Sequence, residues 1–492
     1  MQLKDLIQAL PAASVEGPLD RPVSGITYDS RRVTPGMVFV ALPGQNSDGH
    51  DYIANAIERG AAAIICERNG ILFPRTTKIR VPDGREALAR AAISYYAHPS
   101  SKLKVVGVTG TNGKTTVSFI VKAILEAAGM KSGLIGTVQY EVAERIIPAH
   151  RTTPESLDVQ QLMAQMIEGR CTGCVMEVSS HALEQKRVFG IEFDVAIFTN
   201  LTGDHLDYHG SMENYYQAKR KLFTSLGQGM KKGAAIINID DAFGARLYGD
   251  TQLEVLLTYG MQRPARLRAT NIELSREGSR FVVEGPGRNF AVRSPLIGRH
   301  NIYNALAAIG AGLALDIPVL KLQAALNAMP AVPGRLEKVL LGQPFGVFID
   351  YAHTDDALRN VLTTLREITP GKLLLAFGCG GNRDVTKRAR MGRVAAELAD
   401  YTLITSDNPR KEDPEKIAKD VVSGYRSVRP DRCDVELDRR RAIEHIVDKA
   451  AEGDAVLIAG KGHETYQEFE DTVVPFDDRV HAQEALQSRG YT

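Results

Sequence analysis

The sequence predicts an α/β protein of three domains, and three observations lead to this prediction. Apolar runs of strand length alternate with helix-length segments along most of the chain. Two stretches rich in Pro, Gly or Ser, residues 98–102 and 328–337, interrupt this alternation in the way that linkers do. The length of 492 residues also exceeds what one hydrophobic core usually supports. We therefore expect domains at residues 1–100, 101–331 and 332–492.

The first domain is expected to be a smaller α/β unit. Its strand-like runs are GMVFVAL at 36–42 and AAAIICE at 61–67, and helical periodicity covers 50–60 and 84–97. Turn-forming residues separate these segments. The pattern therefore predicts a small sheet with helices packed against it.

The central domain is expected to be doubly wound around a mainly parallel sheet. Its apolar runs are continuous, as in strands that are buried on both faces, and helical segments separate them. Two more polar strand-like stretches then precede an Ala-rich helix that starts near Asn301. The apolar runs span residues 104–110, 174–178, 194–200 and 234–240, and the polar stretches span 267–275 and 279–285.

The third domain is expected to be a Rossmann-like α/β unit. It contains apolar runs that each end in small or polar residues and are separated by helix-length segments. Open sheets of this kind bind ligands in a crevice at the carboxyl ends of their strands. The runs span residues 346–352, 372–378, 401–407 and 455–462.

The chain carries no global charge that would attract nucleic acid or an anionic membrane surface. Its 60 basic and 59 acidic residues give a formal net charge of +1. The starting segment MQLKDLIQALPAASVEG lacks the apolar centre of a secretory signal. Asp316 and Pro318 interrupt the apolar run AAIGAGLALDIPVL well below the length of a membrane span. We therefore expect a cytoplasmic protein without membrane insertion and without a nucleic-acid partner.

The five cysteines, an odd number in a long chain, fit a reducing compartment better than a disulfide framework. Cys171 and Cys174 form a CTGC pair without a second pair elsewhere in the sequence. A zinc site would need that second pair. We interpret the two residues as small apolar side chains that lead into a strand.

A glycine-rich loop, GVTGTNGKTT at 107–116, lies between an apolar strand and a predicted helix. In this context the backbone amides and the helix N-terminus form an anion site, Lys114 adds positive charge, and Thr115 can bind Mg²⁺. The usual pattern has Gly where this chain has Val108, and a tight turn with a chance Gly-Lys-Thr is the alternative. The loop predicts a nucleotide and does not identify a reaction. The expected nucleotide-binding residues here are Gly110, Thr111, Asn112, Gly113, Lys114, Thr115 and Thr116.

Polar side chains also follow two other predicted strands of the central domain. Glu177 ends the run at 174–178, and Asp204 and His205 follow the run at 194–200. A carboxylate at a strand end near the phosphate loop is the expected second anchor for Mg²⁺. Asp204 and Ser179 can equally be turn or helix-capping residues. Because Mg²⁺ prefers oxygen ligands, spacing alone leaves the role of His205 open.

Lys219 lies on the apolar face of the predicted helix at 211–223, between Tyr215 and Leu222. A buried ammonium must pair with a carboxylate, lose its proton or be modified. The alternative is a side chain that extends along the helix surface until its amine reaches solvent.

Motifs along the whole chain resemble those of the Mur ligases, ATP-dependent enzymes that add amino acids to the peptide of the peptidoglycan precursor. In this family the loop reads GTNGKT, so the earlier glycine is not required. The matching motifs are DSR at 29–31, DGH at 48–50, GTNGKTT, RTTP, EVSSHALEQKR, GDHLDYHG, YYQAKRKLF, GRHNIYNALAA, PGRLE, DYAHTDDAL, GCGGNRD, SDNPRKEDP and GKGHE.

The resemblance implies the roles of several residues already singled out. Lys114 and Thr115 would bind the ATP phosphates, and Lys219 would be carbamylated, which turns a cation into a carboxylate that can bind metal. The implied catalytic residues are Lys114, Lys219, His205 and Glu177, and the implied Mg²⁺ ligands are Thr115, Glu177, His205 and Lys219. Asn301, Arg335 and Asp350 match positions that contact the nucleotide, although the residues alone indicate a helix cap at Asn301 and a linker charge at Arg335.

The resemblance also implies two substrate sites. Ser30 and His50 resemble uridine-site residues, and the contacts to the muramoyl peptide would be Thr152, Thr153, Ser179, Gln185 and Arg187. DNPR at 407–410 resembles the version in members that add meso-diaminopimelate, whose second carboxylate Arg410 can bind bidentately. On the residues alone, DNP begins a turn and Arg410 is a surface charge. The implied diaminopimelate residues are Arg383, Asp407, Asn408, Arg410, Gly460 and Glu464.

The implied activity is the ATP- and Mg²⁺-dependent joining of meso-diaminopimelate to the D-glutamate γ-carboxylate of UDP-N-acetylmuramoyl-L-alanyl-D-glutamate. The reaction would pass through an acyl phosphate and would serve peptidoglycan synthesis, and with it cell wall biogenesis, cell shape and cell division. We also expect a monomer whose third domain swings towards the second about the linker near Arg335. The alternatives are a related ligase with another amino acid or a folate acceptor, and a regulatory or motor ATPase that needs no carboxylate acceptor.

Overall fold

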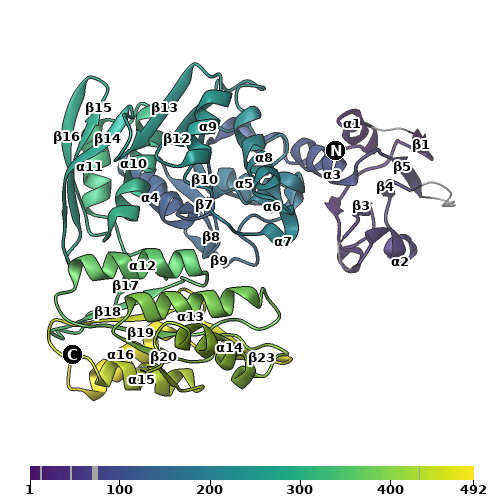
Figure 1. Ribbon diagram of the computed structural model, residues 1–492. Coiled ribbons are helices and arrows are strands. Elements are labelled where there is room, and N and C mark those ends of the chain that lie inside the picture. Colours follow the sequence, from purple (N-terminus) through teal and green to yellow (C-terminus); the bar gives the residue numbers. More distant parts are fainter. Residues whose placement is uncertain (12–13, 45–46, 69–75, 432) are drawn as a thin grey trace. The chain divides into compact units, whose positions relative to one another are not determined.

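A computed structural model describes residues 1–11, 14–44, 47–68, 76–431 and 433–492 (Figure 1). The fold is α/β with mainly parallel sheets, as the sequence predicts: a smaller N-terminal sheet, a doubly wound central sheet and a Rossmann-like C-terminal sheet. The chain forms two compact units, which we call unit 1 (Met1–Ala265 with Ala307–Lys321) and unit 2 (Arg266–Leu306 with Leu322–Thr492). The predicted domain boundaries at residues 100 and 331 stay predictions.

The N-terminal sheet confirms the two predicted strands and has the order β1-β5-β4-β3-β2. β1 runs antiparallel to β5, and the other neighbours are parallel. Alternate residues of β3 point to opposite faces: Val38 packs with α1 and α3, and Phe39 packs with α2. The elements are α1 (Leu3–Gln8), β1 (Ser14–Glu16), β2 (Gly25–Thr27), η1 (Ser30–Arg32), β3 (Met37–Val40), η2 (Gly49–Tyr52), α2 (Ile53–Glu58), β4 (Ala63–Cys66), β5 (Thr77–Arg80) and α3 (Gly84–Tyr95).

The central sheet in unit 1 has the order β13-β12-β11-β6-β10-β7-β8-β9. It is parallel from β13 to β7, and β8 and β9 complete it as antiparallel strands. From β6 the chain passes to β7 and β10 on one side and then to β11 and β12 on the other. The strand order therefore reverses at β6, which places a crevice at the carboxyl end of that strand.

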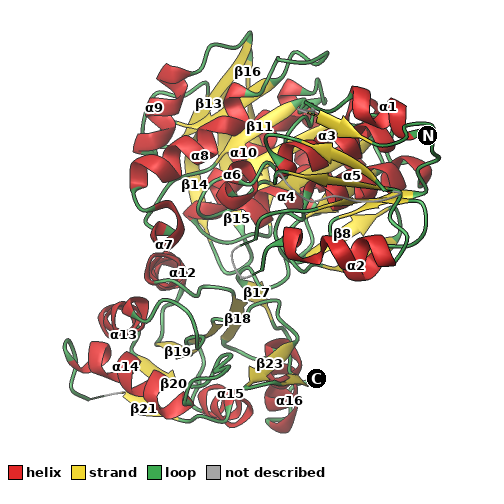
Figure 2. Ribbon diagram, turned by 90° about the vertical axis from the view of Figure 1, so that its right-hand side faces the viewer, coloured by secondary structure: helices red, strands yellow, loops and turns green. Residues whose placement is uncertain are grey.

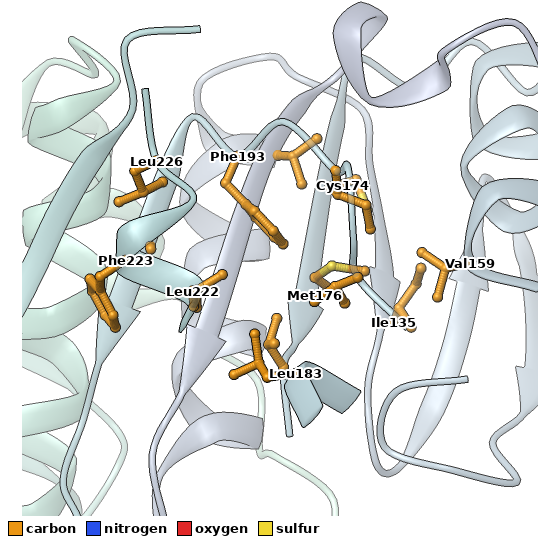
Figure 3. Close-up of a cluster of buried hydrophobic side chains, with 14 of the residues drawn as sticks. Ile135, Val159, Cys174, Met176, Leu183, Phe193, Leu222, Phe223 and Leu226 are labelled. Atoms are coloured by element: carbon orange, nitrogen blue, oxygen red, sulfur yellow. The ribbon is translucent and has the colours of Figure 1, made fainter. Parts of the chain in front are cut away.

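The helices of the central region cover both faces of this sheet. On one face, Cys174 and Met176 of β10 pack with Val159 of α5 and Leu222 of α8 (Figure 3). All residues of β10 are buried, as expected for a strand covered on both faces. The elements are η3 (Pro99–Lys102), β6 (Lys104–Thr109), α4 (Lys114–Ala127), β7 (Ser132–Ile135), β8 (Gln139–Val142), β9 (Arg145–Pro148), α5 (Ser156–Glu168), β10 (Gly173–Glu177), α6 (Ser180–Glu184), β11 (Val195–Phe198), α7 (Leu206–His209), α8 (Met212–Thr224), β12 (Ala234–Asn238), α9 (Ala242–Asp250) and β13 (Val255–Gly260).

Unit 2 begins with three antiparallel strands; two of them, β14 and β15, correspond to the two polar stretches of the sequence, and β16 has no predicted counterpart. They pair in the order β14-β15-β16. The Ala-rich helix that follows starts at Arg299, close to the predicted start. The elements are β14 (Leu267–Leu274), β15 (Ser279–Gly285), β16 (Arg288–Ser294), α10 (Arg299–Ala314) and α11 (Val319–Asn327).

The C-terminal sheet of unit 2 has the order β17-β18-β22-β19-β20-β21 and is parallel except for β17. Helices α12, α13 and α14 cover one face, and α15 and α16 cover the other (Figure 2). Leu375 of β19 packs towards the first face and Leu374 towards the second. The elements are β17 (Glu337–Lys338), β18 (Gly346–Asp350), α12 (Asp355–Ile368), β19 (Leu373–Phe377), α13 (Thr386–Leu398), β20 (Tyr401–Ile404), α14 (Pro414–Arg426), β21 (Cys433–Val435), α15 (Arg439–Asp448), β22 (Ala455–Ala459), β23 (Tyr466–Phe469), β24 (Thr472–Pro475) and α16 (Asp478–Ser488).

Within the described ranges, no helix combines the length and the apolar character that crossing a membrane requires.

Candidate active site

The glycine-rich loop joins β6 to α4 at the crevice of the central sheet. Gly113 has φ 87° and Gly110 has φ 150°, both in the region that side chains disfavour. A Cβ on Gly110 would lie 1.8 Å from Thr199 Oγ1. The loop can therefore follow this path only with glycine at position 110.

The loop is anchored to the carboxyl end of β11. Thr199 Oγ1 donates to the Asn112 carbonyl at 2.6 Å, and Asn112 N donates to Asn200 Oδ1 at 2.9 Å. Thr111 N also donates to the Asn200 carbonyl at 2.9 Å. The sequence analysis gave Thr199 and Asn200 no role, although they end the apolar run at 194–200.

Two lysines contact the same carbonyl of the loop. Lys114, the first residue of α4, donates from Nζ to Gly110 O at 2.9 Å and to Thr111 O at 2.8 Å. Lys219 of α8 donates from Nζ to Gly110 O at 2.8 Å. The structure thus brings Lys114, Lys219 and the loop together.

Lys219 is buried, with 1% of its surface exposed, and its Nζ lies 4.5 Å from the ring centre of Tyr215. The alternative of an amine that reaches solvent is therefore wrong. Burial, and after it the charge of Lys114, hold the pKa of Lys219 well below its usual value of 10.5. Burial at this position therefore shifts the balance towards the neutral amine.

Glu177, the last residue of β10, is buried against hydroxyl groups from two directions. Its Oε2 accepts from Thr115 Oγ1 at 3.2 Å and from Thr137 Oγ1 at 2.9 Å, and its Oε1 accepts from Thr137 N at 2.8 Å. Thr137 Oγ1 also lies 3.0 Å from Thr152 Oγ1. Two of the predicted metal ligands, Thr115 and Glu177, are therefore in direct contact. Thr137 was missed by the sequence analysis.

The residues predicted to contact the muramoyl peptide adjoin Glu177. Thr153 Oγ1 donates to the Glu177 carbonyl at 2.7 Å, and Ser179 N donates to Thr153 Oγ1 at 3.1 Å. Arg187 donates to Thr153 O at 2.9 Å and to Gln185 Oε1 at 2.6 Å. Ser179 also caps α6, which confirms the capping alternative.

His205 lies at the start of α7, with φ 55° and 47% of its side chain exposed. Its ring centre is 4.9 Å from that of His181. Partial burial lowers the pKa of His205; the carboxylate of Asp204 acts against this shift, and Lys114 and Lys219 add to it. Throughout the described residues, His, Cys, Asp and Glu side chains form no group of three or more that could hold a metal ion. A metal at this site would therefore need ligands of other types as well.

The two predicted uridine-site residues are both buried in the N-terminal region. Ser30 begins η1, which Asp29 caps by accepting from Arg31 N. His50 Nδ1 lies 2.6 Å from Asp48 Oδ1, and His50 Nε2 accepts from Glu67 N at 3.0 Å. Because Nε2 accepts a hydrogen bond from Glu67 N, the proton of the ring lies on Nδ1, which donates it to Asp48 Oδ1. Both ring nitrogens of His50 are therefore bonded within the chain.

In unit 2, Asn301 and Arg335 line one pocket of about 90 Å³. Asn301 donates to Ile297 O at 2.8 Å, and the guanidinium of Arg335 lies 4.9 Å from the ring centre of Tyr351. Asp350 accepts from Leu336 N at 2.7 Å, next to Arg335. Burial raises the pKa of Asp350, against the charge of Arg335 and two backbone hydrogen bonds. Each of the three residues of unit 2 that were predicted to contact the nucleotide therefore has a contact within the chain that orients its side chain.

Asp407, Asn408 and Glu464 converge on Lys461, which the sequence analysis did not assign. Lys461 is fully buried, and its Nζ lies 3.1 Å from Asn408 Oδ1 and 3.2 Å from Glu464 Oε2. Asn408 Nδ2 donates to Glu464 Oε2 at 2.8 Å. Burial, and after it the charge of Asp407, raise the pKa of Glu464. Asp407 Oδ1 is buried and accepts no hydrogen bond from any described residue.

The other three predicted diaminopimelate residues surround this group less tightly. Gly460 has φ 110°, and a Cβ there would lie 3.4 Å from Asp407 Oδ2. Arg410 is 20% exposed and donates from Nε to Glu468 Oε2 at 2.8 Å, so it is not a plain surface charge. Arg383 is exposed on the loop between β19 and α13. Arg410 lines a pocket of about 460 Å³ together with Pro409, Lys411, Glu412, Asp413, Pro414, Phe469, Glu470 and Thr472.

A buried ion pair supports the strand ends that carry these residues. Arg439 and Asp478 have fully buried side chains and form two hydrogen bonds of 2.7 Å. Arg439 also donates to Ser406 O at 3.2 Å and to Ala459 O at 3.0 Å, next to Asp407 and Gly460. No motif in the sequence pointed to this pair.

Comparison with known proteins identifies the family. Models of the Mur ligase family match successive stretches: the catalytic domain model at residues 22–96, the middle domain at 108–312 and the glutamate ligase domain at 334–462. A curated relative from Syntrophomonas wolfei is 45% identical over 489 residues, which cover 99% of this chain and 100% of the relative. This chain belongs to the Mur ligase family.

Several of the similar Mur ligases share one description. The relative from Syntrophomonas wolfei is described as UDP-N-acetylmuramoyl-L-alanyl-D-glutamate--2,6-diaminopimelate ligase, and so is one from Listeria innocua, which is 42% identical over 492 residues and 99% of both chains. A solved structure with this description has a TM-score of 0.72 and 31% identity, and the match covers 100% of both chains. The MurF ligase from Thermotoga maritima, solved with ADP, shares the fold at a TM-score of 0.64 and 18% identity, over 95% of this chain and 98% of the other.

Proposed function

We propose that the chain is an ATP-dependent ligase that joins meso-diaminopimelate to the D-glutamate γ-carboxylate of UDP-N-acetylmuramoyl-L-alanyl-D-glutamate. The observation that carries this proposal is the near full-length identity to relatives described as ligases of this kind. Features of the two units support it separately: unit 1 has a glycine-rich loop and a buried carboxylate, and unit 2 has a pocket lined by Arg410.

The phosphate loop would bind ATP. The amides of the loop and of the start of α4 suit the β- and γ-phosphates, and Lys114 Nζ, now bonded to two loop carbonyls, would move onto the phosphates. The adjacent oxygens of Thr115 and Glu177 fit Mg²⁺, which prefers such ligands. Mg²⁺, when bound, would neutralise phosphate charge. His205 would complete the ligand set with Lys219.

Carbamylation of Lys219 would explain why a lysine is buried here. Burial shifts the balance towards the neutral amine, and a neutral amine is the nucleophile that carbon dioxide requires. The product is a carboxylate, which can accept a hydrogen bond or bind a metal where the ammonium could not. This change would also add a second acidic group to the predicted metal ligands, beside Glu177.

The chain's own residues would position two anions for reaction. Arg187, Thr153 and Ser179 would orient the D-glutamate, while Lys114 holds the γ-phosphate for attack by the γ-carboxylate oxygen. ADP then leaves, and the acyl phosphate carries an activated carbonyl. The amine of diaminopimelate attacks that carbonyl, loses a proton, and expels inorganic phosphate that retains one carboxylate oxygen. No protein nucleophile is needed.

The pocket around Asp407 would bind the amino acid. The buried Oδ1 of Asp407 lies 3.7 Å from Lys461 Nζ and accepts no hydrogen bond from a described residue, so an ammonium group of the substrate could donate to it. Arg410 would pair with the second carboxylate of diaminopimelate. Lysine lacks this group and would leave the arginine without that partner, so the pocket should reject it. We assign this activity to a cytoplasmic monomer with the domain boundaries given above.

The test is phosphate release by the purified chain with ATP, Mg²⁺, the UDP-muramoyl dipeptide and one candidate amino acid at a time. We expect release only with the dipeptide and meso-diaminopimelate, at least about 100-fold faster than with lysine, and an intact product of the matching mass. Release without an acceptor would support the motor ATPase, and release with a folate acceptor would support the related ligase.

A further inference from the structure

The guanidinium of Arg410 is held on two sides. Its Nε donates to Glu468 Oε2 at 2.8 Å, and its Nη1 donates to the Gly381 carbonyl at 2.9 Å. A Cβ placed on Gly380 would lie 3.0 Å from the same Nη1, so the loop fits closely around this group. The orientation of Arg410 is therefore set before any substrate binds.

The backbone of Arg410 is fixed by the strand that carries Glu468. Arg410 N donates to Glu468 O at 3.0 Å, and Glu470 N donates to Arg410 O at 2.7 Å. Arg410 has φ 55°, which is uncommon for a residue with a side chain. Glu468 N also donates to Asn408 Oδ1 at 3.1 Å. β23 thus aligns the DNPR segment as well as the arginine side chain.

The two contacts leave the Nη2 end of the guanidinium for a ligand, and Arg410 lines the pocket described above. An arginine has five N–H groups, and Glu468 and Gly381 occupy one on Nε and one on Nη1. The second N–H on Nη1 and one of the two N–H groups on Nη2 form a pair that suits bidentate binding of a carboxylate. Glu468 also balances the charge of Arg410. Binding of a ligand carboxylate by Arg410 therefore depends on the orientation of its N–H groups more than on the net charge of the Arg410–Glu468 pair.

We propose that Glu468 is a positioning residue that presents the Nη end of Arg410 to the second carboxylate of diaminopimelate and so sets selectivity over lysine. This proposal rests on the proposed function. Without Glu468 the arginine would regain rotamer freedom, and substrate binding would have to order it again. The loss should appear in the binding of one substrate only.

The test uses the full chain and measures KM and kcat for each substrate. In Glu468→Ala we expect the KM for diaminopimelate to rise about tenfold, with kcat and the KM values for ATP and the UDP-muramoyl dipeptide changed less than about twofold. Glu468→Gln keeps an acceptor for Nε and should stay within about threefold of the wild type. Asp471→Asn removes the charge of an 89% exposed side chain in the turn of the same hairpin; it is the matched control and should leave every KM unchanged.

Arg410→Ala and the double variant Arg410→Ala/Glu468→Ala show whether Glu468 acts through the arginine. We expect both to have the same KM for diaminopimelate, because Glu468 has nothing to position once the arginine is absent. If Glu468→Ala does not fold, Glu468→Asp replaces it in the test. Its shorter side chain cannot reach Nε in the same geometry, so we expect the same rise in the KM for diaminopimelate.

Several results would overturn the positioning role while the wild type is active with diaminopimelate. These are an unchanged KM in Glu468→Ala, an equal rise in the KM for ATP, additive effects in the double variant, and a wild-type KM in Arg410→Ala. A wild type that releases no phosphate with diaminopimelate would instead contradict the proposed function, so the two failures are distinguishable.

Discussion

Lys219 places a primary amine in a position that excludes water and lies against the phosphate loop. Burial and the charge of Lys114 disfavour its ammonium form. Within the described part of the chain, its Nζ donates one hydrogen bond, to the Gly110 carbonyl at 2.8 Å. A carboxylate built on this amine would replace a disfavoured cation by a useful anion. In our proposal the modification serves metal binding.

We predict that Lys219→Ala lowers kcat by about 100-fold or more, because the site loses a preorganised charged group. Acetate should restore part of the activity, since it supplies the missing carboxylate in the space left by the side chain. Phosphate release at rising acetate concentration measures this. Lys219→Arg is the control: it keeps a cation, fills the space and should stay inactive with acetate. Wild-type kcat in either variant would contradict the account.

Residues of this site differ in how well the sequence predicts them. Glu177 and Lys219 could be found because each places a charge where an apolar pattern does not expect one. Thr137 and Thr199 could not, because they are neutral residues in turns. Their roles come from partners 40 and 87 residues away in the chain, Glu177 and Asn112, and spacing carries no information about such contacts.

The phosphate loop is an element whose path depends on one glycine. We predict that Gly110→Ala lowers ATP turnover by about 100-fold or more, because its Cβ would lie 1.8 Å from Thr199 Oγ1 and displace the loop amides. The control is Gly249→Ala in α9, where a Cβ meets nothing within 4 Å. Turnover and the free energy of unfolding are measured for both. Equal turnover in the two variants would refute the role of Gly110.

The Arg439–Asp478 pair joins α15 and α16 to the ends of β20 and β22. Asp478→Ala should lower the free energy of unfolding by about 3–5 kcal/mol, because it leaves a fully buried guanidinium without its carboxylate. The control Asp471→Ala removes a carboxylate that is 89% exposed, and it should change the free energy of unfolding by less than about 0.5 kcal/mol. Denaturant titration compares the two. A loss below about 1 kcal/mol in Asp478→Ala would show that the pair is not structural.

Among the elements, buried strands could be predicted and edge strands could not. β10 and β11 are buried throughout, so their sequences are continuous apolar runs. β9 is mostly exposed at the edge of the sheet, and its sequence RIIP has no alternation that favours a strand. The predicted helix at 50–60 is divided between η2 and α2, because Asp48 caps a 3₁₀ turn by accepting from His50 N.

For the whole molecule, histidines held neutral by the fold link stability to pH. Burial lowers the pKa of His300 to about 4, while the unfolded chain titrates near 6.5. Between these values the unfolded state binds the proton and the folded state does not, so stability rises with pH through this window and is lost as pH falls through it. His463, whose pKa is lowered to about 3 by burial and by Arg335, acts in the same direction.

We predict that the free energy of unfolding falls by about 1–2 kcal/mol per histidine of this kind between pH 7 and pH 5. In His300→Gln, which keeps a polar group beside Thr364 Oγ1, the fall should be smaller by one such contribution. Denaturant unfolding at several pH values provides the measurement. A variant with the same pH dependence as the wild type would contradict the assignment to His300.

The central claim is that the γ-carboxylate of the D-glutamate becomes an acyl phosphate at the phosphate loop before the amine attacks. The most direct test uses UDP-muramoyl dipeptide with ¹⁸O in that carboxylate, together with ATP and diaminopimelate. The account predicts one ¹⁸O in the inorganic phosphate for each amide formed. Amide formation with unlabelled phosphate would contradict it.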